Sequence, residues 1–454
     1  MSFLWYLASF LLALAVLIVV HEMGHLLVAR WCGVQVLRFS VGFGRPLLSR
    51  RWGRDNTEWV VSAFPLGGYV KMLDERESSV PEALLHRAFN RQPVLKRVAI
   101  VSAGPVANLG LAVIIYFGIF MTGVMDMKPL LSAPKVGSIA AAAGFQGGEV
   151  VTMVDGQKIV SWTELRKQLL QAVLDQKSVS LAAVDANGDL TVRTLSLSGT
   201  QFDDMESDPA GKLGFQPFVP PHEPVIGSVS PGSPARSAGM QAGDRVLSVN
   251  GEPVTEWQQV VGHIRPAFGK SLTIEVSRED ERIKFQVVPA LVMESGEAVG
   301  RLGIAVKPDD TLYEGMMVNI RHGPIGSLSR ALHEVWYISA LSLRMMGRMI
   351  TGEVSLKNLS GPVTIADYAG QSAHLGISPY LRFIALISIS LGVLNLLPIP
   401  ILDGGHLMYY LIELFKGSPV SDRAVEIGQK IGVGVLGSLM LLALYNDFHR
   451  LISG

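Results

Sequence analysis

The segment at 21–25 reads HEMGH, which places two histidines four residues apart with a glutamate beside the first. On a helix, residues i and i+4 lie on the same face, so both imidazoles can reach one metal ion. Glu22 lies one position round from His21, where it could take a proton from a water that the metal activates. We therefore expect His21 and His25 to bind zinc and Glu22 to act as a general base in hydrolysis.

A catalytic zinc site takes three protein ligands and leaves one position for water, so a third ligand must come from elsewhere. The best candidate is Asp403, near the end of the run NLLPIPILDGGH at 395–406. Pro398 and Pro400 cannot continue a regular helix, so the backbone is expected to open just before Asp403. His406 is the rival ligand; we favour Asp403 because it stands at the end of the break.

The composition indicates a membrane protein. Charged residues make up 17% of the chain, below the roughly 25% of soluble domains, and apolar residues reach 49%. The formal net charge is zero, so a nucleic-acid partner is not expected. The single cysteine, Cys32, excludes an intramolecular disulfide and leaves His, Asp and Glu as the metal ligands.

Four apolar runs are candidates for membrane helices, since a span takes about 20 mostly apolar residues. They are 3–20, 98–125, 383–402 and, weaker because of two charged residues, 425–446. The first run lacks the basic start and the cleavage site of a signal peptide. It leads directly into the HEMGH segment, and ionisable residues at membrane depth usually mark function. The alternative is that these polar side chains only reach toward the lipid headgroups.

The loop charges predict the orientation. Residues 30–97 hold twelve Lys or Arg against six Asp or Glu, so this loop is expected in the cytoplasm. Both termini and the long region 126–380 then lie outside, and both chemical motifs fall near the cytoplasmic face.

The outer region contains an internal repeat. Residues 136–162 and 231–257 align without a gap and share eleven identities at a spacing of 95. Each copy predicts a short helix closed by Gly144 or Gly239, followed by a strand that ends in a tight turn. A period of this size indicates two whole domains rather than a solenoid.

Each copy is predicted to finish in a strand, at 212–217 and at 301–306. The two copies resemble PDZ domains of the permuted bacterial kind, which are α+β and take an extended peptide as an added strand. The alternative is two domains that only screen access. Residues 323–350 have apolar side chains at helical spacing but four charges, which favours an amphipathic helix on the membrane surface over a soluble packing helix.

The HExxH motif in the first span, NxxPxPxLDGG in the third and PDZ-like domains between them resemble the site-2 proteases, over essentially the whole chain. The similarity is greatest to the bacterial branch with four spans and two tandem PDZ domains. It implies a zinc metalloendopeptidase with one zinc ion held by His21, His25 and Asp403, and with Glu22 activating water.

The same resemblance implies substrate contacts. VGFGRP at 41–46 and FPLGGYVKM at 64–72 are similar to the family's membrane re-entrant β-hairpin, which covers about 36–72. Without the resemblance, this stretch reads as a glycine-rich loop. A strand there could pair with an unwound substrate. The residues implied in substrate binding are Asn395, Gly42, Phe43 and Gly44.

The expected fold is a polytopic α-helical membrane protein with four membrane helices, a membrane-associated β-hairpin and two outer PDZ-like domains. SAGPVANLGLA at 102–112, with small residues suited to close helix packing, and LSGPVTIA at 359–366 also match the family. The expected divisions are 1–125 with the first two helices and the hairpin, 126–220 and 221–309 for the PDZ-like domains, 310–380 for an amphipathic juxtamembrane segment, and 381–454 with the last two helices.

The resemblance further implies a place and partners. The chain is expected in the bacterial inner membrane, with the lipid bilayer, a single-span substrate of the anti-sigma-factor type and an upstream periplasmic protease that cuts first. Signal-peptide remnants are a second implied substrate, and envelope-stress signalling is the implied process. Two rivals remain: a transporter with an intramembrane proton or metal relay, and a noncatalytic scaffold.

Overall fold

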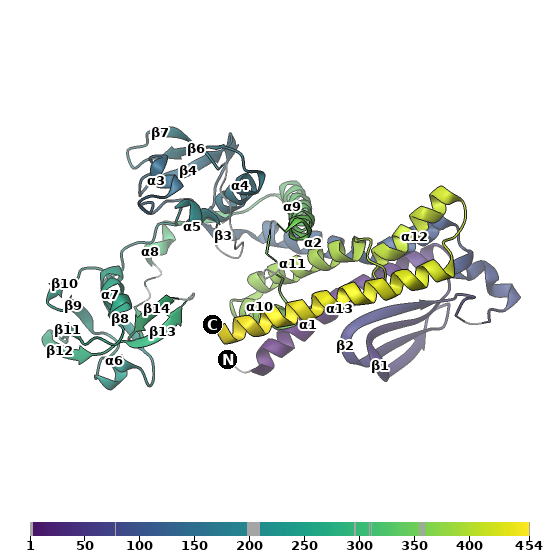
Figure 1. Cartoon of the computed structure of the whole chain (residues 1–454), viewed down its shortest axis with the longest axis horizontal. Coiled ribbons are helices and arrows are strands. Elements are labelled where there is room, and N and C mark those ends of the chain that lie inside the picture. Colours follow the sequence, from purple (N-terminus) through teal and green to yellow (C-terminus); the bar gives the residue numbers. More distant parts are fainter. Residues whose placement is uncertain are drawn as a thin grey trace. The chain divides into compact units, whose positions relative to one another are not determined.

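The computed structural model describes residues 3–77, 79–197, 209–294, 297–307, 309, 311–352, 354–355 and 359–453 (Figure 1). The chain forms two compact units. One consists of Met1–Val124 and Ile320–Phe448, and the other of Met125–Asn319 and His449–Gly454.

Four helices in the described part of the first unit are long and apolar enough to cross a membrane. They are α1 (Phe3–Trp31), α2 (Val94–Thr122), α11 (Ile377–Leu396) and α13 (Asp422–Ser453). The number of candidate spans is confirmed, and several of the predicted ends differ from those of the helices. Helix α2 stops at Thr122 because Gly123 takes a φ of 98°, and α11 stops at Leu396, before the prolines.

Helices α1, α2 and α11 pack closely because small residues face one another. A Cβ on Gly24 of α1 would collide with the Ala103 carbonyl oxygen of α2, so only glycine allows this approach. On the other side of α2, the Ser388 hydroxyl of α11 donates a 2.8 Å hydrogen bond to the Asn108 carbonyl oxygen. Helix α2 therefore packs between α1, which carries the HEMGH segment, and α11, which precedes the segment that leads to Asp403.

After α11, residues 397–402 are non-helical, as the two prolines predict. Ile401 takes a φ of +98°, a conformation that is rare for a β-branched residue. Helix α12 (Asp403–Lys416) then begins at Asp403 itself. A Cβ on Gly404 or on Gly405 would meet the backbone of the non-helical segment, so these glycines let α12 start directly against it.

The stretch between α1 and α2 forms a hairpin of β1 (Val36–Trp52) and β2 (Thr57–Met72), as the resemblance implied (Figure 1). The two strands are long enough to bend back on themselves. The first half of β1 lies between residues 57–61 and residues 68–72 of β2, while the second half pairs with 57–62 again. The hairpin is therefore a small antiparallel sheet, and 68–72 form one of its edges.

Glycines make these bends possible. Gly42, Gly44 and Gly67 have φ of 92°, 90° and 128°, which other residues rarely adopt. The Phe43 ring packs over Gly67, where a Cβ would collide with it. Phe43 is also stacked on Tyr69, with ring centroids 6.2 Å apart.

Helices α9 (Pro324–Thr351) and α10 (Pro362–His374) complete the first unit. The predicted helix at 323–350 is confirmed. Ala331 and Val335 of α9 pack against residues of α2 and α11, while Ile325 and Trp336 are 87% and 73% exposed. The helix is thus amphipathic in the structure as well as in its sequence.

The second unit holds two β-rich domains of the same topology. In the first, β5-β4-β6-β7 are neighbours in that order, and in the second β10-β9-β11-β12 follow the same pattern. The first consists of α3 (Ile139–Ala142), β4 (Val150–Val154), β5 (Gln157–Lys158), α4 (Trp162–Asp175), β6 (Val179–Val184) and β7 (Leu190–Leu195). The second consists of α6 (Pro234–Ser237), β9 (Arg245–Val249), β10 (Glu252–Pro253), α7 (Trp257–Ile264), β11 (Leu272–Arg278) and β12 (Glu281–Val287).

Equivalent residues of the repeat make equivalent contacts. The Ser138 hydroxyl accepts a 3.2 Å hydrogen bond from the Ala141 amide and caps α3. The Ser233 hydroxyl accepts a 3.3 Å bond from the Arg236 amide and caps α6 in the same way. The sequence repeat is therefore a repeat of structure, each copy with its own hydrophobic core.

Only one of the two predicted closing strands is confirmed. Ile304–Val306 (β15) pairs with Ile226–Val229 (β8). In the first copy, the prediction of a strand at 212–217 is wrong, because Pro209–Leu213 (α5) is helical and Pro217 makes a single bridge. A proline has no N–H to donate, so it cannot continue a ladder.

Short elements connect these parts. They are η1 (Glu82–Arg87), η2 (Phe89–Arg91), β3 (Val124–Met127), η3 (Arg265–Ala267), β13 (Ala290–Glu294), β14 (Glu297–Arg301), α8 (Thr311–Glu314) and β16 (Met317–Ile320).

Candidate metal centre

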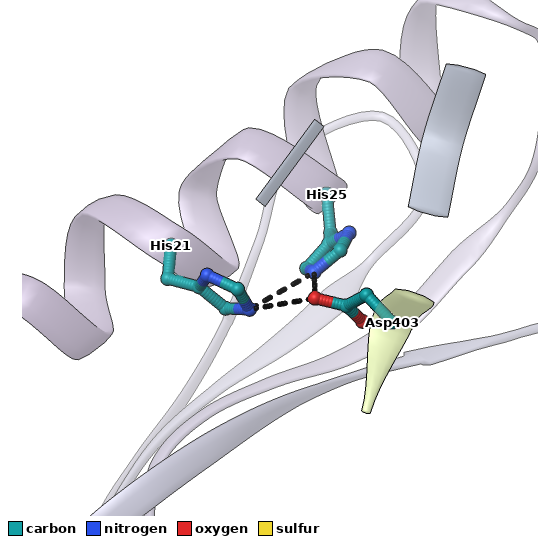
Figure 2. Close-up of side chains that lie close together, drawn as sticks. All are labelled: His21, His25 and Asp403. Atoms are coloured by element: carbon teal, nitrogen blue, oxygen red, sulfur yellow. Dashed lines mark hydrogen bonds and ion pairs between the residues drawn. The ribbon is translucent and has the colours of Figure 1, made fainter. Parts of the chain in front are cut away.

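Helix α1 carries the HExxH segment inside one unbroken helix. His21 and His25 therefore lie on the same face, one turn apart, and both are buried. Asp403 reaches the same point from the first residue of α12 (Figure 2). Among the residues that the structure describes, these three form the group of metal-ligand type whose ligand atoms all lie within 4.8 Å of one another.

The ligand atoms of His21, His25 and Asp403 that face one another form a nearly equilateral triangle. The Asp403 Oδ2 atom lies 3.2 Å from His21 Nε2 and 3.5 Å from His25 Nε2, and the two Nε2 atoms are 3.3 Å apart (Figure 2). Zinc bonds of about 2.0–2.1 Å in a tetrahedral site place neighbouring ligand atoms about 3.3 Å apart. The triangle therefore has the size of one face of a zinc tetrahedron, with the fourth corner left for water.

Contacts to the Nδ1 atoms, which do not belong to the triangle, orient both imidazoles. The His25 Nδ1 atom lies 2.8 Å from the Ile100 carbonyl oxygen, which can only accept, so Nδ1 carries the proton. On His21, Nδ1 lies 3.3 Å from the side-chain amide of Asn108, a fully buried residue of α2. The Asn108 Oδ1 atom has no partner among the described residues, and turning the amide over lets it accept from His21 Nδ1.

These contacts fit a bound cation. With Nδ1 protonated on both imidazoles, each Nε2 presents a lone pair inward. Asp403 Oδ2, which is buried and accepts no hydrogen bond in the described part of the chain, faces the same point. Three acceptors turned toward one another repel unless a positive ion lies among them, and the nitrogen and oxygen donor set suits zinc.

Two glycines leave room for this arrangement. A Cβ on Gly104 of α2 would collide with His25 Nε2 and would lie 2.8 Å from His21 Cε1. A Cβ on Gly68, at the edge of the hairpin sheet, would lie 2.9 Å from Glu22 Cγ. Both distances are shorter than side chains tolerate, so a larger residue at either position would move a site residue.

Glu22 lines a cavity of about 820 Å³ together with the three candidate ligands. The edge strand at 68–72 forms another part of the wall, and Arg97 and Glu413 form a third part. A base, a candidate metal centre and an exposed strand edge are thus brought to one space. This combination can hold an extended peptide against a group that activates water.

The other predicted residues differ in their relation to this cavity. Asn395 lies in the last turn of α11, and neither it nor Gly42, Phe43 or Gly44 is among the residues that line the cavity. His406, the rival ligand, does line it but does not belong to the triangle. Burial lowers the pKa of His406, and its position sets it apart from the triangle.

The sequence analysis missed two residues of the site, Gly104 and Asn108. The stretch 102–112 was interpreted as helix packing alone. A lone asparagine in an apolar span was the available signal, because polar residues at membrane depth usually have a function. No comparable signal distinguishes Gly104 from the many other glycines, whereas Gly68 lies in the glycine-rich stretch 64–72 that was assigned to the hairpin.

Comparison with known proteins agrees with this geometry. The model of peptidase family M50 matches residues 9–439. The chain is 43% identical over 451 residues to regulator of sigma-E protease RseP of Escherichia coli (strain K12), covering 99% of this chain and 100% of the relative. It is 42% identical over 456 residues to protease RseP of Yersinia pestis, covering 99% and 100%.

A third relative comes from Neisseria meningitidis serogroup A and is named as a candidate zinc metalloprotease. It is 39% identical over 447 residues, covering 98% of this chain and 99% of the relative. The predicted resemblance to the site-2 proteases is confirmed. The chain belongs to peptidase family M50, and it is a zinc-dependent protease of the membrane.

Proposed function

We propose that this chain cleaves single-span membrane proteins within or near the bilayer, with zinc held by His21, His25 and Asp403. The observation that supports this most is the triangle of ligand atoms, with sides of 3.2, 3.3 and 3.5 Å, at the buried end of an apolar helix. Glu22 is adjacent in sequence and lines the same cavity, which supports its role as the general base.

The chemistry is amide hydrolysis. When bound, zinc polarises the scissile carbonyl and lowers the pKa of a water molecule. Glu22 takes the proton of the attacking water and delivers it to the leaving amine. Ile100 and Asn108 keep the two imidazoles in the orientation that binding requires, and the bilayer and surrounding helices restrict water to the cavity.

The substrate is an extended peptide, because a helix hides the scissile amide from the attacking water. Among the described residues, the edge strand at 68–72 pairs on one side only, and it lines the cavity beside Glu22, which supports strand addition there. Asn395 holds the substrate backbone as it approaches. In this proposal Gly42, Phe43 and Gly44 contact the substrate outside the cavity, where Phe43 is 45% exposed.

The proposed substrate is a single-span protein of the anti-sigma-factor type, already cut on the outer side by a periplasmic protease. Signal-peptide remnants are a second substrate of the same form. Two relatives of similar length carry names that refer to sigma-E or RseP, which supports a role in envelope-stress signalling. The chain lies in the inner membrane, with both termini and the β-rich domains in the periplasm and the active site near the cytoplasmic side.

The two β-rich domains are PDZ-like, and they act as a size filter. Their shared strand order and their equivalent helix caps support the first statement. The size-filter role is supported by the size of these domains. Two folded domains lie between α2 and α11 in the sequence, and a large substrate domain would collide with them. Capture of a peptide on a sheet edge is the alternative role.

The test is the variant Glu22→Gln in the purified full chain. We expect it to abolish cleavage of a trimmed single-span substrate while leaving about one zinc per chain, because the proposal makes Glu22 a base and not a ligand. Mass spectrometry measures the products, and metal analysis measures the zinc. Unchanged cleavage would contradict the assignment of Glu22, and loss of zinc would make it a ligand instead.

A further inference from the structure

Arg97 and Glu413 form a partly buried ion pair between α2 and α12. The Arg97 Nη1 atom donates to Glu413 Oε2 at 3.1 Å and Nη2 donates to Oε1 at 2.7 Å, so the pair is bidentate. The two side chains are only 11% and 13% exposed. Two parallel charge-assisted bonds fix direction as well as distance, which a single contact does not do.

The pair is itself held in place by its surroundings. The Arg97 guanidinium lies over the ring of Tyr410, 4.8 Å from its centroid, and its Nε atom donates to the Gln92 carbonyl oxygen at 3.0 Å. On the cytoplasmic loop, Phe89 packs edge-on against Tyr410 with ring centroids 6.4 Å apart. Tyr410 belongs to α12, so its contact with Arg97 adds to the connection between α2 and α12. The bond to Gln92, which precedes α2, limits how far the Arg97 side chain can follow Glu413 if α12 moves.

Helix α12 connects this pair to the metal centre. Asp403 is its first residue and Glu413 lies ten residues later, about 15 Å along a straight helix. The segment before Asp403 is non-helical and includes the strained Ile401. The direction of α12 therefore depends on its packing contacts, at its start against the non-helical segment and along its length against α2.

We propose that Arg97 and Glu413 are positioning residues that set the tilt of α12 and thereby place the Asp403 carboxylate at the zinc ion. This inference rests on the proposed role of Asp403 as a ligand. Asp403 lies about twice as far from the middle of α12 as Glu413 does, so if the helix turns about its middle, a shift of about 1 Å at Glu413 moves Asp403 by about 2 Å. Metal–ligand distances hold to about ±0.2 Å, so such a shift breaks the coordination.

The experiment measures zinc affinity by competition with a chelator, on the full chain in nanodiscs. Arg97→Gln and Glu413→Gln are each expected to weaken zinc binding at least tenfold. Arg97→Lys should weaken it less, because lysine keeps the positive charge but cannot make two parallel hydrogen bonds to the carboxylate. The exchanged pair Arg97→Glu with Glu413→Arg should recover most of the affinity.

The chain contains a matched control. Arg193 makes bidentate bonds of 3.0 and 2.8 Å to Glu149 and lies 4.8 Å from the centroid of the Phe145 ring. This pair lies in the first β-rich domain. Arg193→Gln removes the same kind of interaction and should leave the zinc affinity within twofold of the unchanged chain.

A double-variant cycle separates positioning of Asp403 from a general structural role. In an Asp403→Ala background, Arg97→Gln should cause no further loss of zinc affinity, because the carboxylate through which it acts is gone. An additional tenfold loss there would overturn the proposal. So would single variants that bind zinc as the unchanged chain does.

Three further outcomes are decisive. If Arg97→Gln does not fold, the exchanged pair takes its place: recovery of both fold and affinity supports the proposal, and recovery of the fold alone overturns it. If Asp403→Ala keeps full zinc affinity, the proposed ligand set has failed. If Asp403→Ala loses zinc while the Arg97 and Glu413 variants keep it, only the positioning role has failed.

Discussion

Substituting Gly104 by alanine tests the geometry of the metal centre without replacing any ligand. The new Cβ would lie 2.7 Å from His25 Cε1 and 2.8 Å from His21 Cε1, where ordinary contacts begin at 3.4 Å. It would also collide with His25 Nε2. Both imidazoles must therefore move by about 0.6 Å or more, beyond the roughly 0.2 Å that metal–ligand distances tolerate.

The magnitude follows from the cost of overpacking. One extra methyl group in a filled site costs about 1–3 kcal/mol. Without metal, the imidazoles can move away from the new methyl group. With metal, both must return to the triangle of ligand atoms, so most of this free energy is lost from zinc binding. At about 1.4 kcal/mol per tenfold, zinc affinity should fall between about fivefold and about 150-fold.

Gly110→Ala is the control, because Gly110 lies on the same helix and its Cβ would meet nothing within 4 Å. Chelator competition on the purified full chains gives both affinities. The reasoning is refuted if Gly104→Ala binds zinc as tightly as the unchanged chain, or if Gly110→Ala weakens binding equally.

Three other predictions concern the ligands, the orientation and the outer domains. Asp403→Ala should remove most of the bound zinc and His406→Ala little of it, as measured by metal analysis; the reverse order would make the histidine the third ligand. Reporter fusions within 79–90 should report cytoplasm, and fusions within 180–190 or after the C-terminus the outer side, whereas a cytoplasmic C-terminus would remove α13 as a span. Deleting 130–308 should allow cleavage of untrimmed substrates in a gel assay, while slower cleavage of trimmed substrates alone would indicate recruitment instead.

Local patterns were readable from the sequence because their physical causes lie within a few residues. The spacing of His21 and His25 places both on one helix face wherever that helix packs. The apolar runs, the proline break before Asp403 and the repeat of two β-rich domains depend likewise on local composition. The exact ends of helices were less predictable. The apolar run predicted an end at residue 125, whereas α2 ends at Thr122, before Gly123.

The distances of the triangle were decided by tertiary structure alone. Asp403 meets the histidines only because α12 packs against α2, and no periodicity encodes a contact between opposite ends of the chain. The same is true of Gly104 and Asn108, whose roles arise from what α1 places opposite them. The sequence by itself determined which chemistry is present. Packing between distant helices decided where the ligand atoms stand, because zinc coordination depends on differences of a few tenths of an ångström that only the assembled core can hold.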